Sequence, residues 1–324
     1  MSLNEFALIR QYFTDLGEGD GVALGVGDDC ALLDIPTASQ LAVTTDTLVV
    51  GIHFPTTAKP GEIARRALRV NLSDLAAMGA TPRWFTLALT LPEVDEGWLA
   101  AFSAALAEDA NDFHCALVGG DTTAGPLTLS LQMMGLVPAG KALTRSGARA
   151  GDAIYVTGSL GEGAAALQLF APDCPLPDSV QRQLHQRFYR PTPRLREGEK
   201  LRELASSAID ISDGLLADLG HIAESSSLGA EVQLSHLPLA PWLSAVTPAG
   251  QLQQWALSGG DEYELCFTVP QRHCPAVDEL IAAGELMATR IGRMTTTAGV
   301  RCVDAEGRPV EVALRGYQHF QRQP

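Results

Sequence analysis

Apolar residues recur along the first 140 residues in two different spacings, one typical of helices and one typical of strands. In the segment 95–113 they return every three to four positions, which predicts an amphipathic helix. Two further helices are predicted at 5–16 and 61–79. Strands that alternate with helices of this length indicate an α/β arrangement. Short runs rich in apolar and β-branched residues predict these strands at 22–26, 40–50, 83–91, 115–121 and 127–137.

A segment rich in glycine, alanine and arginine, residues 138–152, separates these elements from a second set. The second set begins with the apolar run 153–160 and includes a predicted helix near 194–206. A chain of 324 residues is long enough for two domains that each have a core. We therefore predict two domains of the α/β (α+β) class, residues 1–140 and residues 141–324. Further patterned segments of the second domain are 207–224, 256–270 and 312–320.

The composition excludes several classes of protein. Hydrophobic residues make up 46% of the chain and charged residues 19%, which is typical of a well-packed globular protein. The 38 acidic residues exceed the 23 lysines and arginines, and the resulting net charge of −15 repels nucleic acid. No apolar run approaches the length of a membrane span, and the first residues lack the apolar core of a signal peptide. The six scattered cysteines include no C-x-x-C pair, as expected for reduced thiols. We therefore expect a cytoplasmic protein without a nucleic-acid or membrane partner.

Aspartates flanked by glycine, serine or threonine recur at predicted strand ends and turns. Each one alone is more commonly a turn or helix-cap residue, because aspartate favours both positions, but several separate loops here repeat the same chemistry. Two of them, Asp28 and Asp29, are adjacent, and the next arginine along the chain is Arg65. Carboxylates beside hydroxyl groups such as those of Thr44 and Thr45 suit Mg²⁺, a hard cation that shares its coordination shell with phosphate groups. We therefore predict a metal site built by several acidic loops, which contain Asp28, Asp29, Asp46, Asp74, Asp121, Asp210 and Asp213.

The chain contains no conventional phosphate-binding loop. The segment 135–142 resembles one, but an alanine stands where a serine or threonine would hold Mg²⁺. The segment 25–30 lacks the third glycine of a dinucleotide-binding loop. Two Gly-Gly-Asp turns, at 119–121 and 259–261, either bind an anion through their amides or are ordinary tight turns.

Two basic side chains are candidates for contact with a phosphate group. Arg145 is the best single cation for a polyphosphate, although an arginine in a linker is commonly just solvated. His53 follows a predicted strand and either contacts a ligand or has a structural role.

Taken together, these motifs resemble those of the thiamine-monophosphate kinases, a family in the superfamily that includes aminoimidazole ribonucleotide synthetase. The resemblance spans almost the whole chain, with the motifs in the same order. They include "GVGDDCALL", "TTDTLVVGIHF", "NLSDLAAMGA", "LVGGDTT", "LTRSGARAGD", "AIDISDGL", "SGGDEYELCF" and "GYQHF".

The resemblance implies a fold and a reaction. It implies an N-terminal α/β domain that binds ATP and Mg²⁺ and forms a homodimer through its sheet, and a C-terminal α/β domain that completes the active site. The implied reaction is the Mg²⁺-dependent, direct in-line transfer of a phosphoryl group from ATP to thiamine monophosphate, the last step of thiamine diphosphate biosynthesis. ATP is then a co-substrate, and several Mg²⁺ ions are the cofactors.

The resemblance also implies roles for individual residues. Asp46, Asp121 and Asp213 are the expected catalytic residues, and Gly120, Asp121, Arg145 and Ser212 the expected ATP contacts. The expected substrate contacts are His53, Asp261 and Tyr317. The expected Mg²⁺ ligands are Asp29, Thr44, Thr45, Asp46, Asp74, Asp121, Asp210 and Asp213.

One departure from the family leaves a question open. The family usually has Gly-Gly-Glu-Asp-Tyr where this chain has Gly-Gly-Asp-Glu-Tyr at 259–263. Either Asp261, which is one methylene shorter than the usual glutamate, or Glu262 therefore contacts the substrate. Two alternative functions also remain: another ATP-dependent enzyme of the superfamily, such as aminoimidazole ribonucleotide synthetase, and a non-catalytic protein that binds Mg²⁺ and nucleotide.

Overall fold

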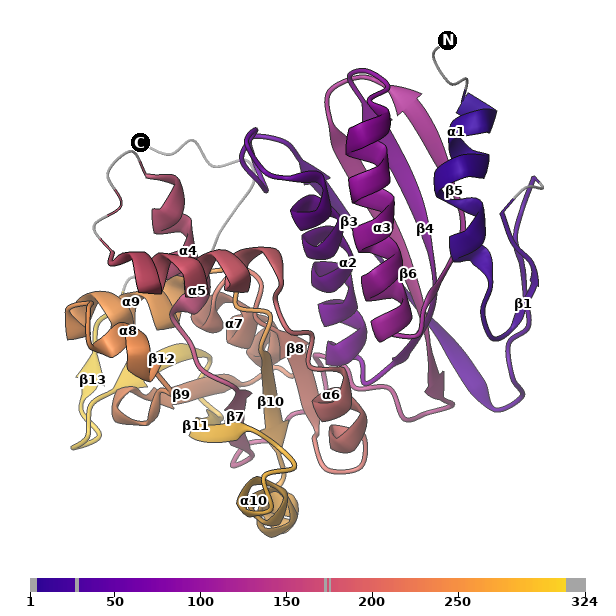
Figure 1. Cartoon of the computed structure of the whole chain (residues 1–324). Coiled ribbons are helices and arrows are strands. Elements are labelled where there is room, and N and C mark those ends of the chain that lie inside the picture. The colour runs from indigo at the N-terminus through magenta and orange to yellow at the C-terminus, as the bar shows by residue number, and fades with distance from the viewer. Residues whose placement is uncertain (1–4, 27–28, 172–173, 175, 313–324) are drawn as a thin grey trace. The chain divides into compact units, whose positions relative to one another are not determined.

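The computed structural model in Figure 1 describes residues 5–26, 29–171, 174 and 176–312. The chain forms two compact units, of which the first comprises Met1–Leu75 and Ala80–Lys141 and the second Ala76–Gly79 and Ala142–Pro324. Both units combine helices with a β-sheet, so the predicted α/β class is confirmed. Among the described residues, no helix has the length and apolar character needed to cross a bilayer.

The first unit is built on a four-stranded sheet with the strand order β3-β6-β4-β5. β6 is antiparallel to both β3 and β4, whereas β4 and β5 are parallel, and α3 supplies the crossover that parallel neighbours need. Figure 1 shows α2 and α3 side by side on one face of this sheet. The elements are α1 (Glu5–Tyr12), a 3₁₀ turn (Thr14–Gly17), β1 (Val22–Leu24), β2 (Leu32–Leu33), β3 (Ser39–Val49), α2 (Pro60–Ala77), β4 (Thr81–Leu91), α3 (Glu96–Asp112), β5 (Ala116–Ala124) and β6 (Thr128–Pro138).

Side chains alternate between the two faces of this sheet, as the period of a strand requires. Leu131 of β6 and Leu87 of β4 are buried on the face that the helices cover. On the opposite face, Trp84 packs in a small cluster that includes Val22 of β1 and Leu33 of β2. Much of this second face is exposed, and Leu41 and Val43 of β3 lie there with 40% and 52% of their surface accessible.

A buried carboxylate joins α2 to α3. Asp109 of α3 is completely buried and accepts hydrogen bonds from Arg65 at 2.6 Å and from Arg69 at 2.5 and 3.0 Å. Arg69 also lies over the ring of Phe113, 5.0 Å from its centroid. Paired charges of this kind fix the two helices in one register, because a lone charge in the same place would be strongly unfavourable.

The second unit contains a seven-stranded sheet with the order β13-β12-β9-β11-β7-β10-β8. Helices cover both faces: α7 and α9 pack on Ile154 and Val156 of β7, while α6 and α10 pack on the intervening Tyr155. β7 and β10 are therefore buried on both faces, which explains why they are mostly apolar and do not alternate with polar residues. The elements are β7 (Ala153–Thr157), α4 (Glu162–Leu167), α5 (Asp178–Tyr189), α6 (Leu195–Leu201), β8 (Ser207–Asp210), α7 (Leu215–Ser225), β9 (Gly229–Gln233), α8 (Pro241–Ser244), α9 (Ala249–Ser258), β10 (Leu265–Val269), α10 (Cys274–Ala282), β11 (Ala288–Thr295), β12 (Gly299–Val303) and β13 (Pro309–Val310), with 3₁₀ turns at Gln168–Phe170, Leu234–His236 and Gln271–His273.

Two predicted helices are shorter in the structure. The helix predicted at 5–16 ends at Tyr12 and is followed by the 3₁₀ turn. The helix predicted near 194–206 ends at Leu201. The segment 207–224 contains a strand and a helix, which the loop around Ser212 separates. The last predicted segment, 312–320, lies outside the described residues from position 313 onward.

We expect Asp109→Ala to lower the free energy of unfolding by about 3 kcal/mol or more, because it removes the buried carboxylate that two arginines share. Urea unfolding followed by tryptophan fluorescence measures this change. Glu108→Ala is the matched control: the Glu108 side chain is 66% exposed although it also pairs with Arg65. Its loss should cost less than about 1 kcal/mol. Equal effects of the two substitutions would contradict the stabilising role of the buried pair.

Candidate active site

The first group of predicted ligands lies between β3 and α2. Thr44 and Asp46 share the face of β3 that is directed toward α2, and the Thr44 hydroxyl donates a hydrogen bond to the carboxylate of Asp74 in α2. The backbone amide of Asp46 donates to the side-chain oxygen of Asn71 at 3.0 Å. Asn71 is itself fully buried and donates to the carbonyl of Ala67 at 2.8 Å. Asn71, which fixes the main chain of β3 at the position of Asp46, was not predicted from the sequence.

The carboxylates of this group repel each other. Burial raises the pKa of Asp46 to about 6, and the negative charge of Asp74 adds to the effect. A hydroxyl and two carboxylates form an oxygen-only donor set, which suits Mg²⁺ because this ion completes its shell with water and substrate phosphates. Among the described residues, no three His, Cys, Asp or Glu side chains come close enough to hold an ion by themselves. One hydroxyl and two carboxylates would leave room in the shell of such an ion for water or for ligand oxygens.

Thr45 does not join this group. Its side chain lies on the opposite, exposed face of β3, because neighbouring residues of a strand point to opposite sides.

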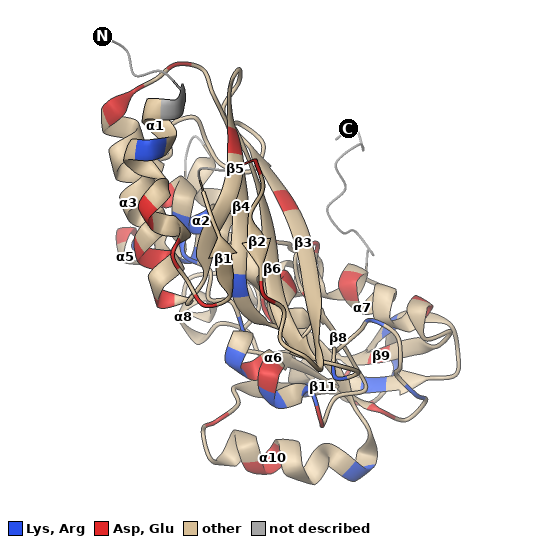
Figure 2. Cartoon of the chain, turned by 90° about the vertical axis from the view of Figure 1, so that its right-hand side faces the viewer, with Lys and Arg blue, Asp and Glu red and all other residues tan. Residues whose placement is uncertain are grey.

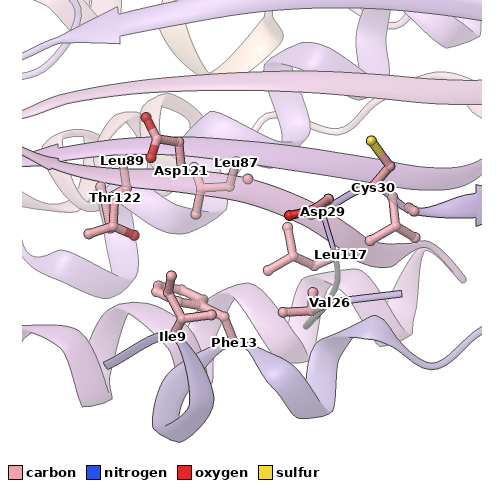
Figure 3. A pocket seen from close by; sticks show the side chains of 14 residues that line it. Ile9, Phe13, Val26, Asp29, Cys30, Leu87, Leu89, Leu117, Asp121 and Thr122 are labelled. Atoms are coloured by element: carbon pink, nitrogen blue, oxygen red, sulfur yellow. The ribbon is translucent and has the colours of Figure 1, made fainter. Parts of the chain in front are cut away.

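The second group of predicted ligands lines a cavity of about 370 Å³ beside β5. Asp29 and Asp121 are its two acidic lining residues, and most of the remaining lining is apolar, including Ile9 and Phe13. Figure 3 shows Ile9 and Phe13 below the strand that carries Asp121 and Thr122, whereas the carboxylate of Asp121 points to the upper side. A cavity of this size with few polar groups is typical of a small-molecule site.

Gly120, which also lines this cavity, has a structural reason to be glycine. A Cβ atom at this position would overlap the carbonyl oxygen of Leu87 in β4, so only glycine permits the close approach of β5.

The two groups of carboxylates lie at opposite edges of the sheet. The register aligns Asp46 with Leu131, Leu131 with Leu87, and Leu87 with Gly120, so that three strand spacings separate β3 from β5. Three spacings amount to roughly 14 Å, which is too far for a single ion to bridge. Figure 2 shows acidic segments on both of these strands. The first unit therefore presents two separate groups of ligands.

His53 has a defined orientation just after β3. Its Nδ1 accepts a hydrogen bond from the amide of Val49 at 3.0 Å, and its carbonyl accepts one from Arg66 at 3.1 Å. In the neutral ring the proton is then on Nε2, which can donate one hydrogen bond to an anionic ligand.

In the second unit, Asp210 ends β8 and the predicted residues Ser212 and Asp213 follow in the loop before α7. The buried carboxylate of Asp218 accepts hydrogen bonds from three successive amides, those of Ser212, Asp213 and Gly214, each at 3.1 Å. Burial raises the pKa of Asp218 to about 7, and the charge of Asp213 acts in the same direction. Asp218 was not predicted, although it holds the main chain of two predicted residues.

The turn at 259–263 lies directly against this loop. The amide of Asp261 donates to the carbonyl of Ser212 at 2.9 Å, and the amide of Tyr263 donates to the carbonyl of Ile211 at 2.8 Å. Asp261 and Tyr263 both have left-handed backbone conformations, with φ of 63° and 48°. Such conformations are strained for residues other than glycine and are concentrated at functional sites. The structure thus brings together Asp210, Ser212, Asp213 and Asp261.

Arg145 lies in an exposed loop beside β8. The carbonyl of Thr144 accepts a hydrogen bond from the amide of Ala208 at 2.9 Å, which ties this loop to the strand that ends at Asp210. Within the described part of the chain, the guanidinium group of Arg145 has no hydrogen-bond or ion-pair partner. Two residues noted in the sequence, Asp28 and the predicted substrate contact Tyr317, lie outside the described residues.

Comparison with known proteins identifies both parts of the chain. Residues 27–137 match the family model for the N-terminal domain of AIR synthase related proteins, and residues 149–304 match the model for the C-terminal domain. Over 322 residues the chain is 49% identical to the thiamine-monophosphate kinase of Escherichia coli, with 99% of each protein covered. The chain belongs to the thiamine-monophosphate kinase family. The kinase of Bacillus subtilis is a more divergent member, at 33% identity over 98% of this chain and 100% of its own.

Solved structures of the kinase family share this fold. The thiamine-monophosphate kinase of Stenotrophomonas maltophilia matches with a TM-score of 0.86 and 44% identity, over 96% of this chain and 99% of its own. A structure described as AaThiL complexed with AMPPCP and TMP matches with a TM-score of 0.77 and 30% identity, over 99% of both chains. The Escherichia coli hydrogenase maturation protein HypE, at 23% identity and a TM-score of 0.75, shares the fold alone. The predicted aminoimidazole ribonucleotide synthetase-like fold is thus confirmed.

For this member of the kinase family, we expect Asp218→Ala to increase amide hydrogen exchange in residues 212–214 at least roughly tenfold, because three amides lose their common acceptor. Mass spectrometry of peptides that cover this loop measures the exchange. Asp304→Ala is the matched control, since Asp304 also accepts two amides, those of Glu306 and Arg308, in an exposed turn of the same unit. It should increase exchange only in its own turn. Unchanged exchange at 212–214 in Asp218→Ala would show that another contact holds the loop.

Proposed function

We propose that this protein transfers the terminal phosphoryl group of ATP to thiamine monophosphate, which yields ADP and thiamine diphosphate. The observation that carries the proposal is the 49% identity to a thiamine-monophosphate kinase over 99% of both chains. The structure described with AMPPCP and TMP belongs to the same family and covers 99% of this chain. This reaction is the last step of thiamine diphosphate biosynthesis.

The chemistry of the acceptor explains why the site consists mainly of carboxylates and glycines. A phosphate monoester has a second pKa near 6, so at neutral pH it is mostly a dianion and needs no general base. The difficulty is to bring two polyanions into line, and catalysis of such a transfer depends on positioning and charge neutralisation. We propose direct in-line transfer without a phosphorylated enzyme intermediate.

The proposed Mg²⁺ ligands fall into three groups. Thr44, Asp46 and Asp74 form the first, Asp29 and Asp121 the second, and Asp210 and Asp213 the third. Thr45 belongs to none of these groups through its side chain and would hold a different ion from Asp46. When bound, Mg²⁺ neutralises phosphate charge so that the two substrates can approach each other. Asp46, Asp121 and Asp213 are the proposed catalytic residues, one from each group.

The residues proposed to contact the two substrates differ in chemistry, because each contacts a different part of ATP or of thiamine monophosphate. Gly120 lines the largely apolar cavity, which suits the non-phosphate part of ATP, whereas the carboxylate of Asp121 points to the other side of the strand and is proposed to reach the phosphates through its ion. Arg145 is an exposed cation beside β8, and Ser212 lies in the loop that follows this strand; both are proposed to contact the ATP phosphates. For thiamine monophosphate, we propose that His53 donates a hydrogen bond to the phosphate and that Asp261 faces the cationic thiazolium ring. Tyr317 is the third proposed substrate contact.

We also propose a cytoplasmic homodimer that forms through the sheet of the first unit. β3 is an edge strand of eleven residues, and Leu41 and Val43 on its uncovered face are 40% and 52% exposed. Long edge strands with exposed apolar residues are usually paired or covered in a native assembly. A cytoplasmic location agrees with the cysteines, all six of which are free thiols.

Incubation with ATP, Mg²⁺ and thiamine monophosphate tests the proposed reaction. We expect thiamine diphosphate and ADP in equal amounts, because one phosphoryl group moves in each turnover. Chromatographic separation of the thiamine phosphates and adenine nucleotides measures both products. Nucleotide binding without release of ADP would instead indicate a non-catalytic binding protein, and turnover restricted to an aminoimidazole ribonucleotide precursor would indicate the synthetase.

We expect Asp46→Ala to lower kcat by roughly 10³-fold, since an electrostatic group at the reacting phosphates is lost. The variant should remain folded, because it removes a carboxylate whose burial beside Asp74 is itself unfavourable. Steady-state kinetics and thermal unfolding measure the two effects separately. Asp112→Ala is the matched control, because Asp112 is an exposed residue at the end of α3 and should leave kcat unchanged. Wild-type turnover in Asp46→Ala would count against the proposed metal group.

A further inference from the structure

Glu262 lies inside the second unit although it directly follows Asp261 in the turn. Its side chain is completely buried, and its Oε1 accepts hydrogen bonds from the amide of Gly161 at 2.8 Å and from that of Gly163 at 3.2 Å. Its backbone carbonyl accepts a hydrogen bond from the guanidinium group of Arg187. Both the side chain and the main chain of Glu262 are thus anchored to other elements of the unit.

These anchors hold a turn that is strained on both sides of Glu262. The left-handed conformations of Asp261 and Tyr263 are unfavourable for non-glycine residues and persist only where surrounding contacts enforce them. A Cβ atom on Gly163 would overlap the carbonyl oxygen of Gly260, so the first turn of α4 packs directly on the main chain of the strained segment. The side chain of Glu262 spans this contact and is hydrogen-bonded to the amides at the start of α4.

The arginines near Glu262 already pair with other glutamates. Arg194 binds Glu264 through two hydrogen bonds of 2.5 and 2.6 Å, and Arg187 pairs with Glu162 at 3.3 Å and lies 3.9 Å from Glu264. Arg194 also lies 3.7 Å from Glu197, so two arginines face three glutamates, and a charged Glu262 would add a fourth carboxylate. Burial raises the pKa of Glu262 to about 8, and Glu162 and Glu264 add to this rise against the opposite effects of Arg187 and the Gly161 amide. Burial and the neighbouring glutamates therefore favour the neutral form of Glu262.

Asp261 faces away from this cluster. It is only half buried, and its Oδ1 accepts a hydrogen bond from the hydroxyl group of Tyr263 at 2.8 Å. Its amide donates to the carbonyl of Ser212, the proposed nucleotide contact. One turn thus carries the proposed substrate contact and touches the proposed nucleotide loop.

We propose that Glu262 is a positioning residue, which holds Asp261 toward the substrate by anchoring the turn to the amides of Gly161 and Gly163. This inference rests on the proposed kinase function. It assigns the substrate contact to Asp261 and a supporting role to Glu262, which resolves the ambiguity that the exchanged order of these two residues creates.

Kinetic comparison of Glu262→Ala and Glu262→Gln tests the proposal. Glu262→Ala should raise the KM for thiamine monophosphate roughly tenfold or more, because the turn that carries Asp261 is no longer held in place. Glu262→Gln should restore the wild-type KM, because the amide oxygen can accept the same two hydrogen bonds and the group is neutral. Asp261→Asn should raise the same KM without lowering thermal stability, as expected for a contact residue.

The pH dependence of stability provides a second measurement. In the unfolded chain Glu262 loses its proton near its ordinary pKa of 4.5, whereas the folded protein retains the proton up to about pH 8. The contribution of Glu262 to stability therefore falls as the pH rises from 4.5 to about 8. The glutamine variant does not titrate, so its melting temperature should rise relative to that of the wild type over this interval. A constant difference between the two proteins would show that Glu262 is ionised when folded and would contradict the proposed neutral anchor.

Val232→Ala separates positioning from general stability. Val232 is completely buried in β9, two strands away from β7 and the start of α4, and its truncation should destabilise the unit without changing any KM. Wild-type turnover is measured first, because its absence overturns the proposed function itself. With turnover present, an unchanged KM for thiamine monophosphate in Glu262→Ala overturns the positioning role, as does failure of Glu262→Gln to restore it.

Discussion

Repulsion between carboxylates at close range is the constraint on which the candidate site depends. In each of three places an acidic side chain is buried beside another, and the pKa of the buried group rises: to about 6 for Asp46, to about 7 for Asp218 and to about 8 for Glu262. The surroundings offset the unfavourable burial of the carboxylate differently in each case. Asp46 shares its position with a hydroxyl and a second carboxylate, an oxygen donor set that suits a bound cation. Asp218 is surrounded by three backbone amides, and Glu262 by two amides and by arginines that pair with other glutamates.

These environments distinguish carboxylates that can bind a cation from carboxylates that hold the main chain in place. A carboxylate hydrogen-bonded to amides of its own chain has its acceptor capacity partly used, and such bonds do not depend on a ligand. A carboxylate beside another carboxylate is repelled by it and gains most from a cation. Asp46 belongs to the second kind and Asp218 to the first, although both are aspartates beside a second aspartate. The difference lies in what the main chain around each one can donate.

The sequence predicted the elements of the first unit more completely than those of the second. The strands β3, β4 and β6 were predicted to within two residues at each end, because each has a long apolar or β-branched pattern. The helix α5, with the sequence DSVQRQLHQRFY, was missed because only four of its residues are buried and they interrupt a polar segment. β9, β11, β12 and β13 were not predicted either. β11 contains two arginines and a register shift near Gly292, which disturb the alternation that marks a strand.

The kind of ion that the site suits was also easier to predict from sequence than which of its aspartates lie close enough to share one ion. Aspartates beside glycine and threonine indicate a hard cation wherever they lie, but the strand order decides which of them can share an ion. Asp46 and Asp121 are both in strands of one sheet, and only the order β3-β6-β4-β5 shows that they lie at opposite edges. The separation of Thr45 from Thr44 was already implied by the period of a strand. Asn71, Asp218 and Glu262 carried no such signal, because each acts through backbone groups brought close by folding.

A site for two polyanions requires residues that anchor its main chain. The exposed carboxylates of such a site repel one another before any cation or substrate arrives, so their main chain has to be held by contacts that do not involve the ligand. The buried acids do this in the second unit, and Asn71 does it for Asp46 in the first.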